Sequence, residues 1–427
     1  MTFVYLTVAA ILICIFLEWK WHINMGLSAA VFAFLIGCFG LGLAPSALKD
    51  MLPIKIIFPV VAITTFYGFA LENGTLLKVV QHVIYIFRAK PGVIPFILFF
   101  LCVLLGIAGM DAGSVGVIMS PIAMIIVTLG DLPLLPCAIG TLLGSAVGSN
   151  YMFSTGGTIM RGLVEETAFA DSALGISLSI FLNNLICFLI LFLVIFLCFR
   201  HRGHTAKVEK PQPLDKKQKL NLLLILLFIL TAALPAIVGE ATGIAAIQSL
   251  AKRMDVGFMA LLFAFAATLL RLGDITAVIR ARIPWRTLFM VSGVTILIGV
   301  ATEAGVMDAL LSLENRSYPV WLIVPFTALV AGVMSFFSSA ISVVIPTMFP
   351  LVPGLVTATG VTPAYFYVAI ALGAAITALS PFSTGGSIML SACTDEKKRE
   401  KLMFAQLICA WVMLLGVMLY CGVLTIL

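Results

Sequence analysis

Residues 153–160 read Phe-Ser-Thr-Gly-Gly-Thr-Ile-Met, and residues 382–389 read Phe-Ser-Thr-Gly-Gly-Ser-Ile-Met. Seven of the eight positions are identical, and the eighth exchanges one hydroxyl side chain for another. The two copies start 229 positions apart (382 − 153). Both lie inside long apolar segments, where paired glycines flanked by hydroxyl groups need a physical reason.

Two weaker patterns recur in the same order along the chain. Residues 26–34 match residues 257–265 at one glycine, two alanines and two phenylalanines. Residues 68–74 match residues 299–305 at two glycines, an alanine and a glutamate. Both separations are 231 (257 − 26 and 299 − 68). Chance apolar similarity does not keep such a constant register, so the sequence predicts a duplicated fold.

Composition places the chain in a membrane. Of its 427 residues, 62% are hydrophobic and 10% are charged, against roughly 45–50% and 25% in soluble domains. Lipid must therefore solvate most of the apolar surface, and the predicted class is an all-α polytopic membrane protein. The nine cysteines lie nearly all in apolar runs, which favours small buried side chains over disulfides or metal ligands. No P-loop motif is present, so transport must depend on ion gradients or on another subunit.

Twelve apolar segments organise the chain. Ten of them fit single spans, at about 2–18, 24–43, 54–72, 133–163, 172–199, 220–237, 256–271, 285–304, 362–392 and 401–427. Two more, about 93–129 and 319–357, are too long for one span and are interrupted by small or polar residues at 111–114 and 335–339. Both are predicted to be re-entrant hairpins, whose irregular tips survive in a membrane only against protein or a wet cavity.

The predicted organisation is two repeats, 1–199 and 220–427, joined by a basic cytoplasmic linker, 200–219. Each repeat has five spans and one hairpin, so the second repeat enters from the opposite face and the repeats are inverted. With both termini outside, 19 of the 25 Lys and Arg residues fall in cytoplasmic segments, as the positive-inside rule requires. The net charge of +6 is thereby explained by orientation in the lipid bilayer, and no nucleic-acid partner is expected.

The two Ser-Thr-Gly-Gly motifs are candidate binding elements. Glycines and hydroxyls in these long segments predict that the helix unwinds, so that free carbonyls bind a cation and the next helix N-terminus favours an anion. Close packing of small residues is the alternative, but two matched copies favour a site. The candidates are Ser154, Thr155, Gly156, Gly157, Thr158, Ser383, Thr384, Gly385, Gly386 and Ser387.

Other polar residues at depth have two interpretations each. Asp111 is the one acid at a hairpin tip, where a carboxylate costs about 2.5–3.5 kcal/mol on insertion scales, so a cation ligand or proton carrier is favoured over a wet hairpin mouth. Arg161 is either an electrostatic clamp for substrate or a snorkelling side chain. Asn150 is a further substrate-binding candidate. Glu72 and Glu303 end their spans and are interpreted mainly as caps or interface residues.

Several local stretches resemble one carrier family. They are Asn24-Met25-Gly26-Leu27, Phe66-Tyr67-Gly68, Glu72-Asn73-Gly74-Thr75-Leu76 and Leu379-Ser380-Pro381-Phe382-Ser383. These are similar to MatC-type dicarboxylate (malonate) carriers of the ion transporter superfamily, which is related to the divalent anion–sodium symporters. The resemblance implies an elevator-like carrier, usually a homodimer, in which hairpins and broken helices form the moving transport domain.

The resemblance also implies roles for the hairpin tips, which read Ser-Asn-Thr in better-known relatives and help to bind carboxylate and sodium. The matching positions here are 111–113 and 336–338. They place a sodium ion, if one is coupled, at Asp111, Gly113 and Ser338. The neighbouring hydroxyls of Ser114 and Ser339 are then substrate-binding candidates.

The expected function is secondary active transport of a small dicarboxylate such as malonate or succinate. The coupling ion is sodium or a proton, no other cofactor is expected, and the location is the bacterial inner membrane. Two alternatives remain open: the large membrane subunit of a TRAP-type system, and a cation–proton antiporter or oxyanion exporter of the same superfamily. No enzyme is expected, because the sequence contains no metal-ligand cluster and no nucleophile–base pair.

Overall fold

The computed structural model describes residues 2–21, 23–87, 90–130, 132–199, 210–242, 255–305, 319–336, 339–393 and 395–426, with positions 249 and 253. Every regular element in this part of the chain is helical. The first half contains α1 (Thr2–Trp21), α2 (Met25–Phe34), α3 (Pro45–Asp50), α4 (Ile54–Glu72), α5 (Thr75–Phe87), α6 (Ile94–Ile107), α7 (Ala112–Gly130), α8 (Leu134–Ser149), α9 (Thr155–Glu165) and α10 (Ala173–Phe199).

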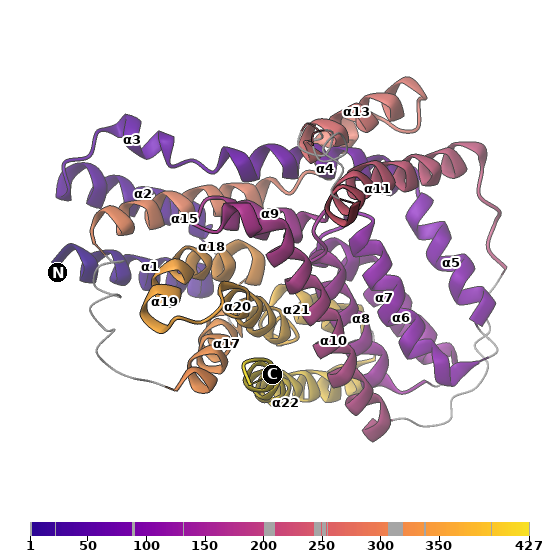
Figure 1. Cartoon of the computed structure of the whole chain (residues 1–427). Helices are drawn as coiled ribbons and strands as arrows, with labels where there is room; N and C mark the ends of the chain where they lie inside the picture. Colours follow the sequence, from indigo (N-terminus) through magenta and orange to yellow (C-terminus); the bar gives the residue numbers. More distant parts are fainter. Residues whose placement is uncertain are drawn as a thin grey trace.

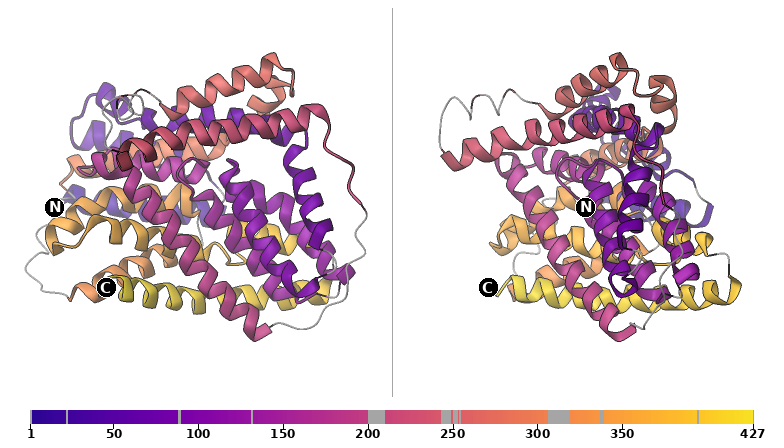
Figure 2. Two further views of the ribbon diagram at one scale, coloured as in Figure 1. Left: turned by 45° about the vertical axis from the view of Figure 1, so that its right-hand side comes forward. Right: turned by 90° about the vertical axis from the view of Figure 1, so that its right-hand side faces the viewer.

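The second half follows the same order. It contains α11 (Lys216–Thr242), α13 (Val256–Leu269), α14 (Ile275–Ala281), α15 (Trp285–Glu303), α17 (Val320–Phe336), the π-helix η4 (Ala340–Val344), α18 (Ile345–Met348), α19 (Val352–Thr359), α20 (Pro363–Thr377), α21 (Thr384–Ala392) and α22 (Glu396–Leu424). In Figures 1 and 2, α22 lies along one face of the molecule, and α11 lies along the opposite face with α13.

The apolar helices fall into two length classes. Three described helical stretches are long and apolar enough to cross a bilayer: Ala170–Phe199, Ala340–Thr359 and Glu396–Leu424. The pair Ile57–Glu72 and Thr75–Phe87 passes the same criterion together but is bent by 59°. Many shorter apolar helices of 10–17 residues surround them. The sequence did not predict α5, because its polar face removes it from a search for continuous apolar runs.

The two predicted hairpin segments each form a pair of helical arms. The first hairpin consists of α6 and α7, joined through residues 108–111. The second consists of α17 and the stretch Ala340–Thr359, which a π-turn and a 3₁₀ turn interrupt. Each second arm contains the proline that the sequence shows there, Pro121 in the first and Pro346 in the second.

Two helix pairs cross at very short range because a glycine faces the partner backbone or ring. A Cβ at Gly26 of α2 would lie 2.2 Å from the carbonyl oxygen of Phe289 on α15. A Cβ at Gly257 of α13 would lie 2.8 Å from the ring of Phe58 on α4. The two contacts differ by 231 positions at both ends (257 − 26 and 289 − 58), which is the separation found in the sequence.

Buried apolar side chains fall into two groups. The larger core joins α4 to α10 with α11, α13, α14, part of α15 and the second-half helices α17 to α22. A smaller core consists of side chains from α1, α2, α3 and α15, and includes Val343 of η4. These four helices lie together at the left of Figure 1. The molecule therefore has a small additional layer that shares α15 with the larger core and includes Val343 of the second hairpin.

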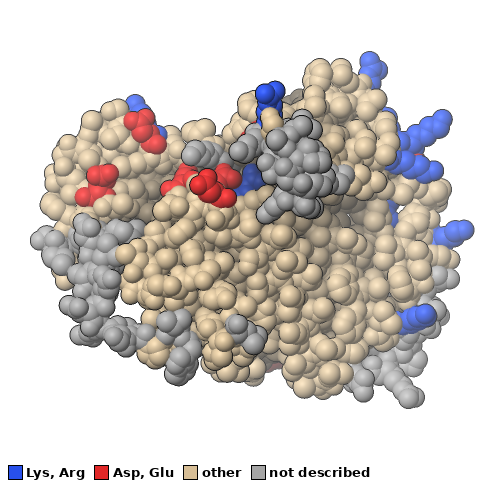
Figure 3. Space-filling view, in the orientation of Figure 1, with Lys and Arg blue, Asp and Glu red and all other residues tan. Residues whose placement is uncertain are grey.

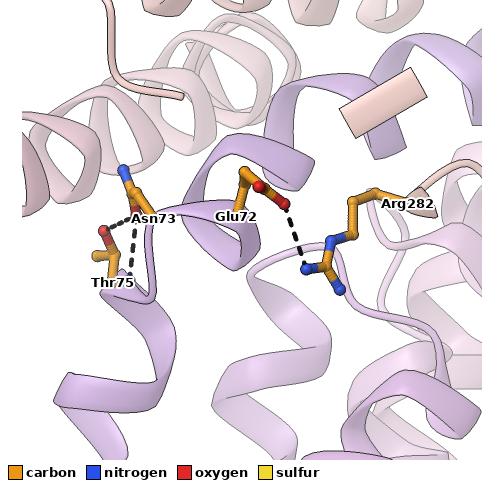
Figure 4. A network of polar contacts seen from close by, with 4 residues as sticks. All are labelled: Glu72, Asn73, Thr75 and Arg282. Atoms are coloured by element: carbon orange, nitrogen blue, oxygen red, sulfur yellow. Dashed lines mark hydrogen bonds and ion pairs between the residues drawn. The ribbon is translucent and has the colours of Figure 1, made fainter. Parts of the chain in front are cut away.

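A polar network joins the end of α4 to segments far along the chain (Figure 4). The Glu72 carboxylate lies 3.4 Å from the guanidinium of Arg282, with both side chains about one-third exposed. The side-chain amide of Asn73 donates to the Leu272 carbonyl at 3.0 Å, and its oxygen accepts from the backbone N–H of Thr75. Glu72 is thus an interface residue, as its position in the sequence indicated.

Charged side chains are sparse on the face shown in Figure 3. Lys and Arg gather at its right edge and top, acidic residues lie in its upper left part, and a broad area between them carries no charge. Large apolar side chains such as Phe39 and Leu419 are about three-quarters exposed. Such exposure is expected where lipid is the solvent.

Gly144→Ala tests the packing of α8 on α6. A Cβ at Gly144 would lie 2.2 Å from the Phe99 carbonyl oxygen, so the helices must separate. We expect overpacking to lower the free energy of unfolding by about 1–3 kcal/mol, measured by thermal unfolding of purified protein in detergent. Gly175→Ala is the control, because nothing lies within 4 Å of the added Cβ; an equal loss in both variants would contradict the packing argument.

Candidate functional site

The first broken helix is held open by one serine. α8 ends at Ser149 and α9 begins at Thr155, so residues 150–154 interrupt an otherwise continuous apolar segment. The fully buried Ser154 hydroxyl hydrogen-bonds to the carbonyl of Ser149 and lies 2.7 Å from that of Tyr151. It also accepts the Gly157 N–H at 3.4 Å, as the N-cap of α9. Ser154 therefore satisfies backbone groups on both sides of the break.

The second broken helix has the same chemistry. α20 ends at Thr377 and α21 begins at Thr384. The Ser383 hydroxyl donates to the carbonyls of Ala378 and Ser380, at 2.6 and 2.8 Å, and accepts the Gly386 N–H at 3.3 Å. Its backbone angles, φ −86° and ψ 164°, are close to the −84° and 172° of Ser154. The two motifs thus form the same local structure.

The glycine pairs have a different role from the one that the sequence suggested. They do not unwind; they begin the second half-helix, and the irregular backbone precedes them. A Cβ at Gly157 would lie 1.9 Å from the Tyr151 carbonyl, and one at Gly386 would lie 2.0 Å from the Ser380 carbonyl. Glycine is required there because the half-helix packs directly on the carbonyls of the break.

Asp111 caps the second arm of the first hairpin. Its Oδ1 accepts the N–H groups of Gly113 and Ser114, at 2.9 and 3.1 Å, and its Oδ2 accepts the Ser114 hydroxyl at 2.5 Å. The carboxylate thereby satisfies the first orphan N–H groups of α7, where a negative charge also suits the helix dipole. Asp111 is partly buried, and these donors compensate the hydration that its carboxylate has lost.

Ser339 caps the second arm of the second hairpin. Its hydroxyl accepts the Ser342 N–H at 3.3 Å, so Ser339 stands where Asp111 stands in the first hairpin. The sequence placed the counterpart of Asp111 near Phe336 instead, but Phe336 ends α17 and stacks on Trp411 with ring centroids 4.8 Å apart. Ser338 lies outside the described residues.

The first tip is tied to the first break. The Thr155 hydroxyl donates to the Gly109 carbonyl at 3.2 Å. Gly109 has φ +92°, and a Cβ there would lie 1.7 Å from the ring of Tyr67, which covers the tip. Only glycine fits both constraints, so tip, break and α4 form one packed unit around this residue.

The tips and breaks surround one cavity of about 250 Å³, here called the central cavity. Five helices present their first turn to it: α7, α9, η4, α15 and α21. Its lining is Asp111, Ala112, Gly113, Leu142, Ser145, Ala146, Ser149, Thr155, Gly156, Pro284, Arg286, Met290, Ser339, Ala340, Ile341, Ser342, Ala378, Ser383, Thr384 and Gly385. Sequence positions predicted separately in both halves are thus brought together.

The cavity is suited to an anion. Gly156 and Gly385 precede the first intrahelical hydrogen bond of their helices, so their N–H groups have no acceptor within the helix. Arg286, at the start of α15, adds a full positive charge. Asp111, the one acid among the described lining residues, keeps its negative charge while it caps α7, and the Arg286 guanidinium offsets that charge. The partial positive charges of the converging helix N-termini are then the remaining field of the site, and they favour an anion.

Arg286 is the residue that the sequence analysis missed. Arg286 lies near the end of a predicted span, where basic residues usually indicate which end of the span faces the cytoplasm. It was therefore counted among the cytoplasmic basic residues and not among the binding residues. A signal for it was present: Pro284-Trp285-Arg286 follows Pro53-Ile54-Lys55 at the same separation of 231 that relates the other repeats. The lining hydroxyls of Ser145 and Ser342 were also not predicted.

The remaining predicted residues lie around the cavity without lining it. Ser114 bonds to Asp111, and Asn150 donates to Asn184 of α10 at 3.3 Å. Arg161 is paired with Glu165 at 3.1 Å. Thr158 and Ser387 lie in the half-helices after the breaks, the first buried and the second exposed.

Ser154→Ala and Ser383→Ala test the caps. Each removes an N-cap and leaves the carbonyls of the break without their donor, so we expect unfolding to become easier by about 1–2 kcal/mol. Ser387→Ala is the control, because this exposed hydroxyl bonds only to the Thr384 carbonyl of its own helix. Thermal unfolding in detergent measures the difference, and equal stability of all three variants would exclude the capping role.

Comparisons with known proteins agree with this architecture. Residues 1–148 match the family described as dicarboxylate carrier protein MatC N-terminus. No match was found among curated proteins. Among solved structures, the YdaH transporter of Alcanivorax borkumensis is similar, with a TM-score of 0.61 and 15% sequence identity, covering 91% of this chain and 89% of that chain. The resemblance to the MatC-type dicarboxylate carriers is therefore confirmed over residues 1–148, on a chain that has the fold of a membrane transporter.

Proposed function

We propose that the protein is a secondary active transporter of small dicarboxylates such as malonate and succinate. It acts by alternating access in the inner membrane, with both termini outside. Its repeats are residues 1–199 and 220–427, inverted relative to each other, with 200–219 as the linker. The match to the MatC family over residues 1–148 supports the substrate class.

The observation that carries the proposal is the set of positive groups around the central cavity. The first turns of five helices and the Arg286 guanidinium meet there. Both carboxylates of a dianion would therefore find positive groups in the cavity. The volume of about 250 Å³ is smaller than the roughly 300–1,000 Å³ of sites for drug-sized ligands, so a small substrate fits best. Lining hydroxyls such as Thr384 supply further donors.

An elevator-like motion is supported by the division of the core. The tips and breaks belong to the larger hydrophobic core, whereas α15, which supplies Arg286, contributes to both cores and packs on α2. A cavity between two bodies can open and close when one body moves past the other. In this proposal the hairpins and broken helices move, and the remaining helices form the scaffold of a homodimer.

Cation coupling is assigned to the first hairpin tip. Asp111 provides the negative charge, and Gly113 and Ser338 complete the proposed sodium site, or Asp111 alone carries a proton. Asp111 lines the same cavity as Arg286, so a bound cation and the substrate anion would lie in one electrostatic environment. Binding of each would then favour binding of the other.

The test of function is uptake of radiolabelled malonate and succinate into proteoliposomes, with and without an inward sodium or proton gradient. Gradient-driven accumulation of either substrate supports the proposal. No uptake of either under both gradients contradicts it.

Arg286→Gln should weaken transport by removing the one full positive charge among the described lining residues. Loss of a charge-assisted contact in a wet cavity predicts a rise in KM of about tenfold. Arg161→Gln is the matched control, because Arg161 is paired with Glu165 outside the lining and should change KM by less than about twofold. The reverse order of effects would show that Arg286 does not bind substrate.

Asp111→Asn separates the charge of Asp111 from its structural role. Asparagine caps helices as well as aspartate does, so α7 keeps its cap while the negative charge is lost. We expect stability to stay nearly constant while the dependence of uptake on sodium or pH is abolished. An unchanged ion dependence would remove Asp111 from the coupling site.

A further inference from the structure

We propose that Lys55 and Arg286 are alternating cationic partners of the substrate, Arg286 in the conformation described here and Lys55 in the opposite-facing one. The proposal rests on the transport function proposed above. It adds a second binding residue, one that lies far along the chain from the lining of the central cavity.

Lys55 and Arg286 occupy the same position in matched helices. Each is the second residue of a 19-residue helix, α4 and α15. Each helix starts after a proline N-cap with nearly equal backbone angles, φ −80° and ψ 67° at Pro53 and φ −79° and ψ 63° at Pro284. Each helix is followed by a left-handed glycine, Gly74 with φ +70° and Gly305 with φ +87°.

Contacts on both sides of these residues fix the register. Three positions after each cation, Phe58 meets Gly257 and Phe289 meets Gly26, again 231 positions apart. Four positions before each cation, Met51 lies against Gly299, and Arg282 lies against Gly68. Three pairs of positions differ by 231: 51 and 282, 55 and 286, and 58 and 289. Because the first and last pairs make matching contacts, the equivalence of Lys55 and Arg286 rests on the structure as well as on the sequence.

The structure itself is asymmetric with respect to these helices. The start of α15 lines the central cavity through Pro284, Arg286 and Met290. In α4, by contrast, none of the residues whose side chains are described lines it, and Ile54 and Ile57, close to Lys55 in the helix, belong to that described part. Instead α4 packs on α9, the half-helix after the first break. α15 contacts η4 and α18 of the second hairpin.

Inverted repeats give the second state by exchanging the conformations of the two halves. That exchange carries the start of α4 to the place that the start of α15 holds here. Under the proposed orientation, α15 begins on the cytoplasmic side and α4 begins on the outer side. The structure is therefore the inward-facing state, and Lys55 replaces Arg286 at the cavity when the cavity faces outward.

The chain contains a matched control pair. Lys49 on α3 and Arg280 on α14 are both exposed cations, and they too are 231 positions apart. Neither lines the central cavity. Lys49 shares the charge and the predicted side of the membrane of Lys55, and Arg280 shares those of Arg286. A difference between the two pairs would therefore come from the position of Lys55 and Arg286 at a helix start.

The experiment measures protection of single cysteines by substrate. Lys55→Cys, Arg286→Cys, Lys49→Cys and Arg280→Cys are introduced singly into a transport-active background in which the native cysteines are replaced. Right-side-out and inside-out vesicles are treated with a membrane-impermeant thiol reagent, with and without malonate at about ten times the half-saturating concentration measured for each variant.

We expect malonate to slow modification about fivefold or more in two variants: Arg286→Cys labelled from the cytoplasmic side, and Lys55→Cys labelled from the outside. The two control variants should change by less than about twofold. Protection of Arg286→Cys without protection of Lys55→Cys overturns the alternation while the proposed function stands. Protection of the controls to the same degree also overturns it.

A second measurement tests the proposal if replacing the native cysteines abolishes transport. In native protein, Lys55→Gln should raise the KM measured from the outer side more than that from the cytoplasmic side, and Arg286→Gln should do the reverse. Equal effects on both sides contradict alternating contacts. Absence of malonate and succinate uptake by the unsubstituted protein is a separate outcome, which contradicts the proposed function and this inference with it.

Discussion

Two helices stop inside the protein, and every backbone group left at each stop needs a partner there. Water satisfies such groups at a surface, but it is scarce at the depth of a membrane. One serine at each break solves most of the problem: Ser154 and Ser383 bond carbonyls of the preceding segment and cap the helix that follows. The rest of the site depends on this, because the breaks can then be buried and the half-helices can point their N-termini inward.

The hairpin tips also contain helix N-termini whose backbone N–H groups need acceptors, and side chains supply them. Asp111 and Ser339 cap the second arms, and Thr155 links the first tip to the first break through the Gly109 carbonyl. Four capped N-termini and the start of α15 then face one cavity. A fold that must satisfy its own interrupted backbone thereby brings several helix N-termini together, and this arrangement favours a negatively charged ligand before any basic side chain is added.

Sequence could predict the elements whose signal is local. Apolar runs predicted the strongly apolar helices but not the amphipathic α5, and the repeated Ser-Thr-Gly-Gly located both breaks to within a few residues. The role of the glycines was misjudged, since a close approach to carbonyls at 151 and 380 leaves no mark in sequence beyond the glycine itself. Arg161 was prominent because of its depth, but Glu165 one turn later neutralises it. Arg286 was overlooked because its place at the cavity depends on which segments the fold brings to α15.

The polar network at the end of α4 has a consequence for how the two faces respond to their surroundings. Gly68 packs against a segment that ends in Arg282, which pairs with Glu72, whereas the matched Gly299 packs against the apolar Met51. One scaffold contact is therefore partly ionic and the other is not. Dissolved salt screens a partly exposed ion pair but has little effect on a thioether contact. In the proposed transport cycle, ionic strength would then act on one side of an otherwise matched framework, so that the salt content of one compartment would bias the balance between the two proposed orientations of the cavity.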